Sequence, residues 1–584
     1  MSKVSGKAFD YGLFIRVVSY SKPYKASFFF TAFLTFLSAA LGPVRPLLIQ
    51  YTLDNSVLSP NASLLLSMTM LMLGFLLIEV VTQYYQSYLA NWVGQSIIKD
   101  IRAEVFKKIT SFKLKYFDKT PIGTLVTRSV SDIETIANIF SEGILIIIGD
   151  LLKLIFVLAI MFYTDWRLSL FSVSTIPILL IATRIFQRSI KSAFKDVRTE
   201  VSRLNTFVQE HITGMNIVQI FNREKREMQK FEEINHSHMN AHIRTVYANA
   251  IFFPVVEILS ACSLALLVWW GGKEALADNV SYGSLVAFIL YIYMLYRPIR
   301  QLADRFNILQ MGMVGSERVF KVIDTEESIP NQGSIPADNI KGDIKIENLW
   351  FAYNDENWVL KDFNLEIKRG QNIAFVGATG AGKSTVVNLL SRFYEFQKGS
   401  IYIDGVNLHD YELESLRSHV GVVLQDVFLF SDSVLNNITL GNPDISREQV
   451  IEAAKSVGAH DFIMRLPGNY DFDVKERGGV LSVGQRQLLA FIRAFVYNPE
   501  ILILDEATSS VDTESEQMIQ AASEKITQGR TSLIIAHRLA TIQNADQIIV
   551  LEKGKIIESG THSSLLEKGG HYKTLFDMQF AEEN

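Results

Sequence analysis

The sequence predicts an all-α membrane domain with six transmembrane helices, followed by a soluble α/β domain. Apolar stretches long enough to cross a hydrocarbon core, which requires about 20 helical residues, recur up to about residue 310. Beyond about residue 340 no such stretch occurs, and short apolar runs typical of buried strands are found instead. The overall apolar share of 48% is therefore an average over a membrane half and a soluble half.

The six predicted spans are residues 27–50, 64–90, 143–163, 168–186, 248–270 and 284–296. Several basic residues precede the first span: Lys3, Lys7, Arg16, Lys22 and Lys25. Residues 54–63, which connect the first two spans, contain neither Lys nor Arg. The positive-inside rule and the even number of spans place the N-terminus and the soluble domain in the cytoplasm of a multi-pass cytoplasmic-membrane protein. No signal peptide is predicted.

The connections after the second and fourth spans are about 50 and 60 residues long, and both have a helical pattern. We therefore expect the spans to continue as helices into the cytosol. Turns predicted at residues 119–123 and 213–216 reverse each helical extension. These turns are either contact elements for the soluble half or ordinary helical hairpins.

Domain boundaries follow from a segment rich in Glu, Pro, Gly, Asn and Asp at residues 324–343, which we expect to be a linker. The membrane domain then covers residues 1–323 and the soluble domain residues 344–584. Composition also excludes several sites. The single cysteine, Cys262, cannot form an internal disulfide or a CxxC metal site, and its apolar surroundings predict a packed thiol. The net charge of −5 argues against a nucleic-acid partner.

A complete P-loop follows a predicted strand at residues 371–376 and precedes a predicted helix at residues 386–390. Its residues are Gly377, Ala378, Thr379, Gly380, Ala381, Gly382, Lys383, Ser384 and Thr385. The glycines allow backbone N–H groups to surround phosphate oxygens, Lys383 reaches the terminal phosphates, and Ser384 can ligate Mg²⁺. The alternative, a glycine-rich turn without a ligand, is disfavoured by the flanking strand and helix.

Two further predicted strands end at polar residues. Residues 501–504 form a short apolar run of the buried parallel type, which presents Asp505 and Glu506 at its carboxyl end. We expect Asp505 to hold Mg²⁺ and Glu506 to polarise the attacking water. Residues 532–536 present His537 in a comparable place, where it can donate to a terminal phosphate or be merely structural.

A second phosphate-binding surface is predicted at residues 481–485, which open a helix and include Ser482, Gly484 and Gln485. Together with the P-loop, this pentapeptide resembles the signature of ATP-binding cassette (ABC) exporters in which the membrane and ATPase domains are fused. Further positions match the motifs of that family: Tyr353 for adenine stacking, Gln425 in the Q-loop, Glu476 in an acidic loop, and Asp512 in the D-loop. Residues 116–123 are similar to the first coupling loop. Lys475, where a glycine is usual, and Arg477 depart from the pattern.

The resemblance implies ATP-driven alternating access in a dimer of half-transporters with ATP and Mg²⁺ as cofactors. ATP on Lys383 of one chain would be capped by Ser482 and Gly484 of the other, and Gln425 would ligate Mg²⁺ and sense the membrane domain. The substrate would be amphipathic or hydrophobic, in contact with membrane lipids. The main alternative is a lipid flippase of the lipid A exporter kind. An importer, a chromosome-maintenance ATPase and a peptide-processing exporter fit the chain less well, and an ATP-gated channel is a more distant alternative.

Two features leave the substrate and the partner open. The spans contain Glu79, Asp150, Lys153 and Glu257, and ionisable residues inside a membrane are candidate sites. If Glu79 and Glu257 line the cavity, a cationic or amphipathic drug-like substrate is favoured; alternatively they pair with Lys153 or Arg297, or face water at an interface. Val483 occupies a signature position where glycine is expected. This substitution resembles the second half of asymmetric exporters and favours a heterodimer, with a homodimer as the alternative.

Overall fold

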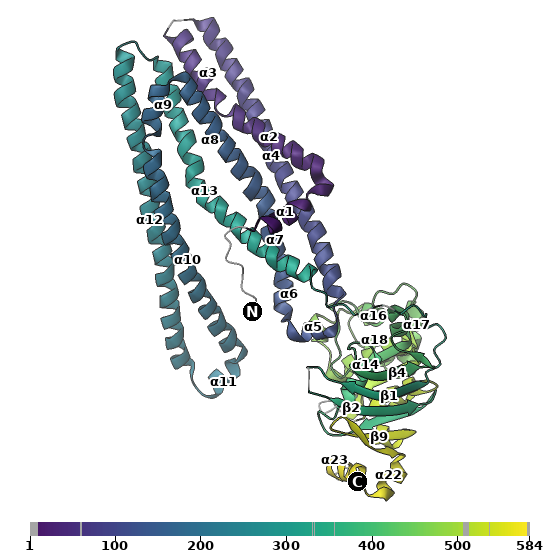
Figure 1. The fold of residues 1–584 in the computed structure, drawn as a ribbon. Helices are drawn as coiled ribbons and strands as arrows, with labels where there is room; N and C mark the ends of the chain where they lie inside the picture. The colour runs from purple at the N-terminus through teal and green to yellow at the C-terminus, as the bar shows by residue number, and fades with distance from the viewer. Residues whose placement is uncertain are drawn as a thin grey trace. The chain divides into compact units, whose positions relative to one another are not determined.

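The computed structural model describes residues 10–58, 61–329, 331, 333–354, 357–505, 513–536 and 538–580. The chain folds into two compact units, and Figure 1 shows the elements of each. The first, here the helical unit, contains the described residues up to Thr110 and Ile122–Thr325. The second, the sheet unit, contains Ser111–Pro121 and the described residues from Glu326 onward. A short segment within the membrane half of the sequence thus belongs to the sheet unit.

The helical unit consists of long helices joined by short turns. Its helices are α1 (Tyr11–Ser19), α2 (Lys25–Leu41), α3 (Val44–Thr52), α4 (Ala62–Thr110), α6 (Ile122–Thr127), α7 (Ile133–Asn138), α8 (Leu145–Thr164), α9 (Trp166–Val173), α10 (Ile176–Thr213), α11 (Met215–Ile220), α12 (Glu224–Leu276) and α13 (Tyr282–Ile323). Three π-helical turns interrupt them: η2 (Leu53–Val57), η3 (Arg128–Asp132) and η4 (Ile139–Ile144). The turns mark places where the regular helical hydrogen bonding changes.

Among the described residues, five helical segments are long and apolar enough to cross a membrane. They are Lys22–Val57, Ala62–Thr110, Ile122–Thr164, Trp166–Thr213 and Glu224–Leu276. The first five predicted spans lie within them and are confirmed as apolar helices. The sixth, residues 284–296, lies in the helix α13 but is not among the five, so its membrane crossing remains a prediction.

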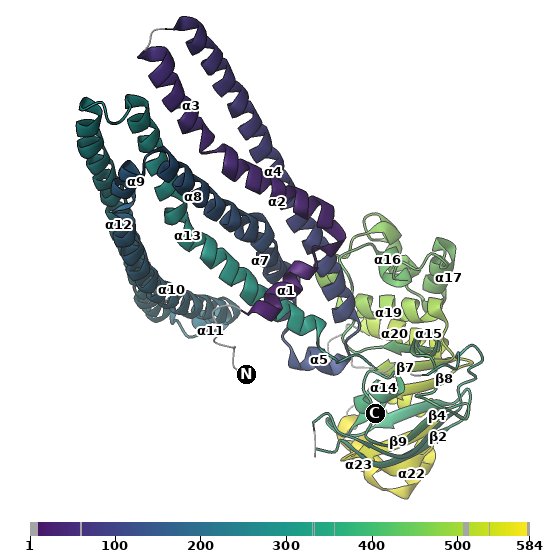
Figure 2. The same ribbon diagram turned by 45° about the horizontal axis from the view of Figure 1, so that its top comes forward.

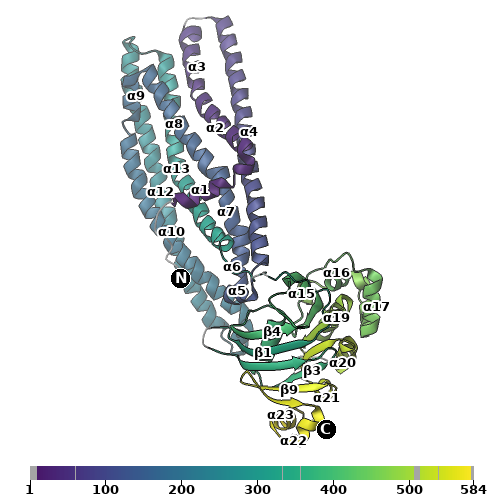
Figure 3. The same ribbon diagram turned by 45° about the vertical axis from the view of Figure 1, so that its right-hand side comes forward.

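Three helices continue well past the predicted spans, and the cytoplasmic location of these extensions stays a prediction. Helices α4, α10 and α12 contain 49, 38 and 53 residues. At 1.5 Å per residue they are about 74, 57 and 80 Å long, well beyond the roughly 30 Å hydrocarbon core. Figures 1 and 3 show α10 and α12 side by side, with α11 between their ends. The chain also reverses at both predicted turns, between Lys119 and Ile122 and after Thr213.

The ends of the helical unit are fastened by polar contacts. Arg16 of α1 forms a two-point ion pair with Asp324, with N–O distances of 2.6 and 2.7 Å, and its guanidinium lies 4.2 Å from the centre of the Phe320 ring. Helix α1 is thereby attached to the end of α13. The expected packing of Cys262 is wrong, because its side chain is exposed on α12.

At the opposite end of α13, the Asp54 carboxylate of η2 accepts a hydrogen bond from Gly283 N at 2.9 Å, and Gln50 Nε2 donates to Ser284 Oγ at 2.8 Å. A Cβ atom on Gly283 would lie 2.5 Å from the Gln50 carbonyl oxygen, a distance that side chains do not adopt. The first span and the start of α13 can therefore approach this closely only with glycine at position 283.

The sheet unit contains two sheets. In its described part, β10 (Lys555–Gly560), β9 (Gln547–Glu552), β3 (Asn372–Val376), β8 (Thr531–Ile535), β7 (Ile501–Asp505) and β6 (Val420–Val423) form one sheet in this order, parallel except for β10. The other, antiparallel sheet has the order β2 (Leu360–Ile367), β1 (Ile344–Phe351), β4 (Lys398–Ile403) and β5 (Val406–Asn407). Figure 3 shows β1 and β4 beside β3 and β9.

Helices cover the larger sheet, with α19 and α20 next to each other in Figure 2. The helices of this unit are α5 (Leu114–Lys119), α14 (Lys383–Leu390), α15 (Leu413–His419), α16 (Val434–Thr439), α17 (Arg447–Val457), α18 (His460–Met464), α19 (Val483–Tyr497), α20 (Thr513–Thr527), α21 (Leu539–Gln543), α22 (His562–Lys568) and α23 (His571–Phe580). The apolar run at residues 501–504 is buried on both faces, as predicted for a central parallel strand.

The predicted linker at residues 324–343 is bonded to the sheet unit over much of its described length. The backbone N–H groups of Ser334 and Ile335 donate to the Asp410 carbonyl at 3.1 and 3.0 Å, and Glu412 N donates to the Ile335 carbonyl at 2.9 Å. Lys341 N donates to the Asp404 carboxylate at 2.6 Å. The segment is thus part of the surface of the sheet unit from residue 334 onward. The predicted bounds of the membrane domain, the linker and the soluble domain remain predictions.

Substitution Gly283→Ala should lower the thermal stability of the purified protein, because the added methyl group forces α13 away from the Gln50 carbonyl. Overpacking of this kind costs about 1–3 kcal/mol. The matched control is Gly272→Ala in α12, where a Cβ atom has no neighbour within 4 Å. The control should be neutral or slightly stabilising, since alanine favours a helix over glycine by up to about 1 kcal/mol. Equal melting temperatures for the two variants would contradict the close contact.

Candidate functional site

The P-loop forms a tight turn between β3 and α14. Gly382 has a φ of +107° and precedes the first turn of α14. A Cβ atom on Gly377 would lie 2.3 Å from the Leu551 carbonyl oxygen, so this position also requires glycine. The turn leaves the backbone N–H groups at the start of α14 directed toward one place, which is the arrangement that binds phosphate.

The Lys383 side chain folds back over this loop. Its Nζ atom donates to the Gly377 carbonyl at 2.5 Å and to the Ala378 carbonyl at 3.3 Å. Lys383 is only 8% exposed, and burial lowers the pKa of its ammonium group, while the nearby Asp505 carboxylate acts in the opposite direction. Asp505, at the end of β7, is therefore near enough to Lys383 for the two charges to attract each other.

Gln425 lies at the same edge of the sheet. Strands β6 and β7 are parallel neighbours, with Val423 opposite Leu504, so Gln425 and Asp505 both follow the carboxyl ends of adjacent strands. Gln425 is exposed. The Ser384 side chain, on the first turn of α14, is also exposed. The predicted metal ligands therefore come from the same end of the parallel strands.

Tyr353 lies beside α14. Its hydroxyl is 3.2 Å from Thr385 Oγ1 and accepts a hydrogen bond from Asn388 Nδ2 at 3.2 Å. The ring of Tyr394 contacts the Tyr353 ring edge-on, with 5.0 Å between the ring centres. Sequence reasoning missed Asn388 and Tyr394. Asn388 could have been found because it lies one helical turn after Thr385, whereas no local pattern indicates Tyr394.

The signature residues form a capped helix end. The Ser482 hydroxyl accepts from Gln485 N at 3.2 Å, and the Gln485 side chain accepts from Ser482 N at 3.0 Å, which is a capping box at the start of α19. Gly484 is buried, whereas Val483 is 43% exposed. The valine side chain thus points to the surface and leaves the helix intact.

The departures at Lys475 and Arg477 have a backbone explanation. Both residues have a positive φ, +60° for Lys475 and +54° for Arg477, a conformation that costs a non-glycine residue about 1–2 kcal/mol. Glycine is therefore the natural residue at position 475. Asp473 offsets part of the cost, because its carboxylate accepts hydrogen bonds from Lys475 N at 2.8 Å and from Lys475 Nζ at 2.9 Å. Glu476 lies between the two residues, in a short helical turn.

Three predicted site residues, Glu506, Asp512 and His537, lie outside the described residues, and their roles remain predictions. The strands β7 and β8, which precede Glu506 and His537 in the sequence, are described and largely buried.

In the helical unit, the charged residues of the predicted spans are grouped. Lys153 interacts electrostatically with four other residues: Glu79, Arg297, Asp150 and Arg45. The charges of Glu79 and Lys153 therefore attract each other, and the role of Glu79 stays a prediction. Glu257 is exposed on α12.

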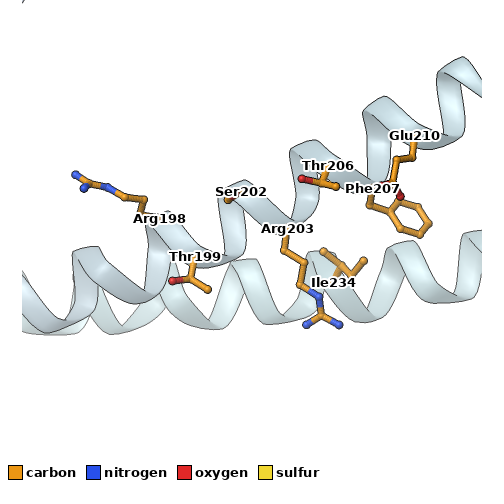
Figure 4. A pocket seen from close by; sticks show the side chains of 8 residues that line it. All are labelled: Arg198, Thr199, Ser202, Arg203, Thr206, Phe207, Glu210 and Ile234. Carbon is orange, nitrogen blue, oxygen red and sulfur yellow. The ribbon is translucent and has the colours of Figure 1, made fainter. Parts of the chain in front are cut away.

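A groove of about 660 Å³ runs along α10 in the same unit (Figure 4). It is lined by Arg198, Thr199, Ser202, Arg203, Thr206, Phe207, Glu210 and Ile234. Seven of these residues come from α10, and only Ile234 comes from α12. The groove contains none of the predicted site residues.

Comparison with known proteins identifies the family. Residues 28–299 match the ABC transporter transmembrane region, and residues 360–509 match the ABC transporter domain. An uncharacterized ABC transporter ATP-binding protein of Bacillus subtilis is 36% identical over 578 residues, covering 98% of this chain and 96% of the relative. An ATP-dependent lipid A-core flippase of Syntrophus aciditrophicus is 36% identical over 572 residues, covering 98% of this chain and 95% of that protein.

A putative multidrug export ATP-binding/permease protein of Bacillus subtilis is 35% identical over 576 residues, covering 97% of this chain and 99% of the relative. These matches extend over the membrane half and the soluble half together. They agree with the P-loop, the signature helix and the apolar helices described above. The chain belongs to the ABC transporter family and carries the transmembrane region and the ATP-binding domain in one polypeptide.

Proposed function

We propose that this chain is one half of a dimeric exporter that uses ATP to move an amphipathic or hydrophobic substrate out across the cytoplasmic membrane. The observation that carries the proposal is the attraction between Lys383 of the phosphate-binding loop and Asp505 at the end of β7, in a chain whose described residues include five helices long and apolar enough to cross a membrane. By the charge distribution of its loops, the N-terminus and the sheet unit lie in the cytoplasm.

ATP binding would replace bonds that the P-loop makes internally. Lys383 now donates to the carbonyl oxygens of Gly377 and Ala378, and the triphosphate oxygens are better acceptors because they are charged. The ammonium group is mostly buried, so its attraction to the phosphates is only weakly screened by water.

The residues at the loop also suit Mg²⁺. This ion prefers oxygen ligands and is usually held by one or two carboxylates together with substrate phosphates. Ser384, Asp505 and Gln425 offer a hydroxyl, a carboxylate and an amide oxygen. When bound, Mg²⁺ would neutralise charge on the phosphates.

The signature helix would complete the site of a second half-transporter. The capping box uses the N–H of Gln485, and the N–H groups of Val483 and Gly484 at the first helical positions remain suited to an external phosphate. The exposed Val483 side chain would then lie against the nucleotide of the partner and crowd it. We therefore favour a heterodimer whose other half carries the expected glycine.

The lipid flippase remains the second candidate, and charge favours it. Lys153 interacts with two carboxylates, Glu79 and Asp150, and also with two further cations, Arg45 and Arg297. Three cations and two carboxylates give this group an excess of positive charge, and all of them except Arg297 lie within the predicted spans. Such a group would attract an anionic lipid head group more strongly than a cationic drug.

The test is transport by the purified half-transporter or its heterodimer in liposomes. Substitution Glu506→Gln should lower the ATPase rate by at least about 100-fold, the scale for loss of a positioned base, while ATP stays bound. In the same variant, ATP-driven movement of an amphipathic dye against its gradient should also stop. As a control, Lys383→Ala should instead weaken ATP binding itself by roughly 10- to 100-fold, because a charged hydrogen bond is lost.

Movement of labelled lipid alone would support the flippase, and a passive ion current would contradict both candidates. Unchanged ATP turnover in the Glu506→Gln variant would refute the role assigned to that carboxylate.

Substitution Val483→Gly should raise the ATPase rate of this chain expressed alone, because it removes the side chain that crowds the second copy's nucleotide. An increase of roughly tenfold corresponds to about 1.4 kcal/mol, within the usual cost of overpacking. The matched control is Val480→Gly, three residues earlier and 55% exposed, which should leave the rate unchanged. High activity of the unmodified chain alone, without a gain from Val483→Gly, would argue for a homodimer.

A further inference from the structure

The segment of residues 111–121, here called the coupling segment, is part of the sheet unit although both of its neighbours in sequence belong to the helical unit. At its start, Phe112 pairs with Ser328 as an isolated β-bridge, and Lys113 N donates to the Glu327 carbonyl at 2.8 Å. Lys113 Nζ also lies 2.6 Å from the Glu327 carboxylate. These bonds fix the start of the segment to residues that follow α13.

The other end of the coupling segment is held by one side chain. The Tyr394 hydroxyl donates a hydrogen bond to the carboxylate of Asp118 in α5. Tyr394 is 8% exposed, and burial, together with this hydrogen bond, raises the pKa of its hydroxyl group. The hydroxyl therefore keeps its proton at neutral pH and acts as a donor to Asp118.

The ring of the same tyrosine contacts the candidate adenine site. It meets the Tyr353 ring nearly at right angles, with an interplanar angle of 87°, and the Phe351 ring at 73°. Tyr353 in turn contacts Thr385 of the P-loop through its hydroxyl, as described above. A continuous series of contacts thus runs from Asp118 through Tyr394 and Tyr353 to the P-loop.

From this arrangement we infer that Tyr394 is a positioning residue that links the coupling segment to the adenine end of the bound nucleotide. The inference rests on the proposed function, in which adenine stacks on Tyr353. Stacking would restrict the Tyr353 ring, whose edge contact orients Tyr394, and the Tyr394 hydroxyl would then hold Asp118. The phosphate end of the nucleotide has a separate route, through Gln425 at the ends of the strands.

The two routes can be separated by comparing ATP with inorganic triphosphate, which lacks the adenosine. ATP occupies both the adenine and the phosphate positions, whereas inorganic triphosphate occupies the phosphate position alone. If Tyr394 carries the adenine signal, ATP should rigidify the coupling segment and triphosphate should not, although both should rigidify the P-loop.

The experiment is amide hydrogen exchange on the full chain in lipid nanodiscs, carried out with Glu506→Gln so that ATP persists. With Tyr394 intact, saturating ATP should slow exchange at residues 383–390 and at residues 114–119. In Tyr394→Phe, which keeps the ring and loses the hydroxyl, ATP should still protect residues 383–390. Protection of residues 114–119 should fall by about fivefold, the effect of one net hydrogen bond of about 1 kcal/mol.

Further variants distinguish a link from a merely structural role. Asp118→Ala should reproduce the effect of Tyr394→Phe, and Asp118→Asn, which keeps an acceptor oxygen, should restore most of the protection. The double variant Tyr394→Phe with Asp118→Ala should be no worse than either single variant, because both remove the same bond. The matched control is Tyr470→Phe, which removes a buried hydroxyl 2.9 Å from His460 Nδ1 and should leave residues 114–119 unchanged.

Full protection of residues 114–119 in Tyr394→Phe, or equal protection by triphosphate and ATP, would overturn the inference while the proposed function stands. Absence of any protection at residues 383–390 by ATP would overturn the proposed function, and the inference with it.

Discussion

The attachment of residues 111–121 to the sheet unit is the constraint on which the rest of the account depends. Helix α4 is about 74 Å long. The eleven residues that follow it belong to the sheet unit, and the chain then returns to the helical unit as α6. The start of this segment is held by backbone pairing at Phe112 and Lys113. Its other end is held by the hydrogen bond that Tyr394 donates to Asp118. Glu327 and Ser328, which follow α13, are bonded to the start of this segment.

Much of the fold could be predicted because it depends on local pattern. The strand predicted at residues 371–376, the apolar run before Asp505, and the helix opened by residues 481–485 each coincide with an observed element. The helical extensions were predictable from periodicity that continues past the apolar spans. What local pattern could not show were contacts between distant residues. Tyr394 meets Asp118 across 276 positions, and no feature of either neighbourhood indicates the pair.

In the candidate site, too, local pattern predicts some features and does not specify others. The P-loop and Asp505 could be placed from sequence because strands of a parallel sheet bring their carboxyl ends to one edge. The state of Lys383, bonded to its own loop carbonyls, depends on a side-chain conformation that a motif does not specify. Lys475 has a similar explanation: the sequence shows a lysine in place of glycine, and the structure supplies the positive φ that makes this exchange costly. Val483, by contrast, is exposed and leaves its own helix undisturbed.

The most direct test is a pair of distances between spin labels, each recorded with and without ATP in a variant that lacks Cys262. One pair joins Lys119→Cys in the coupling segment to Lys368→Cys in the sheet unit, and the other joins Lys119→Cys to Glu232→Cys in the helical unit. If the coupling segment moves as part of the sheet unit, ATP should leave the first distance unchanged and shift the second. A first distance that changes as much as the second would contradict the account.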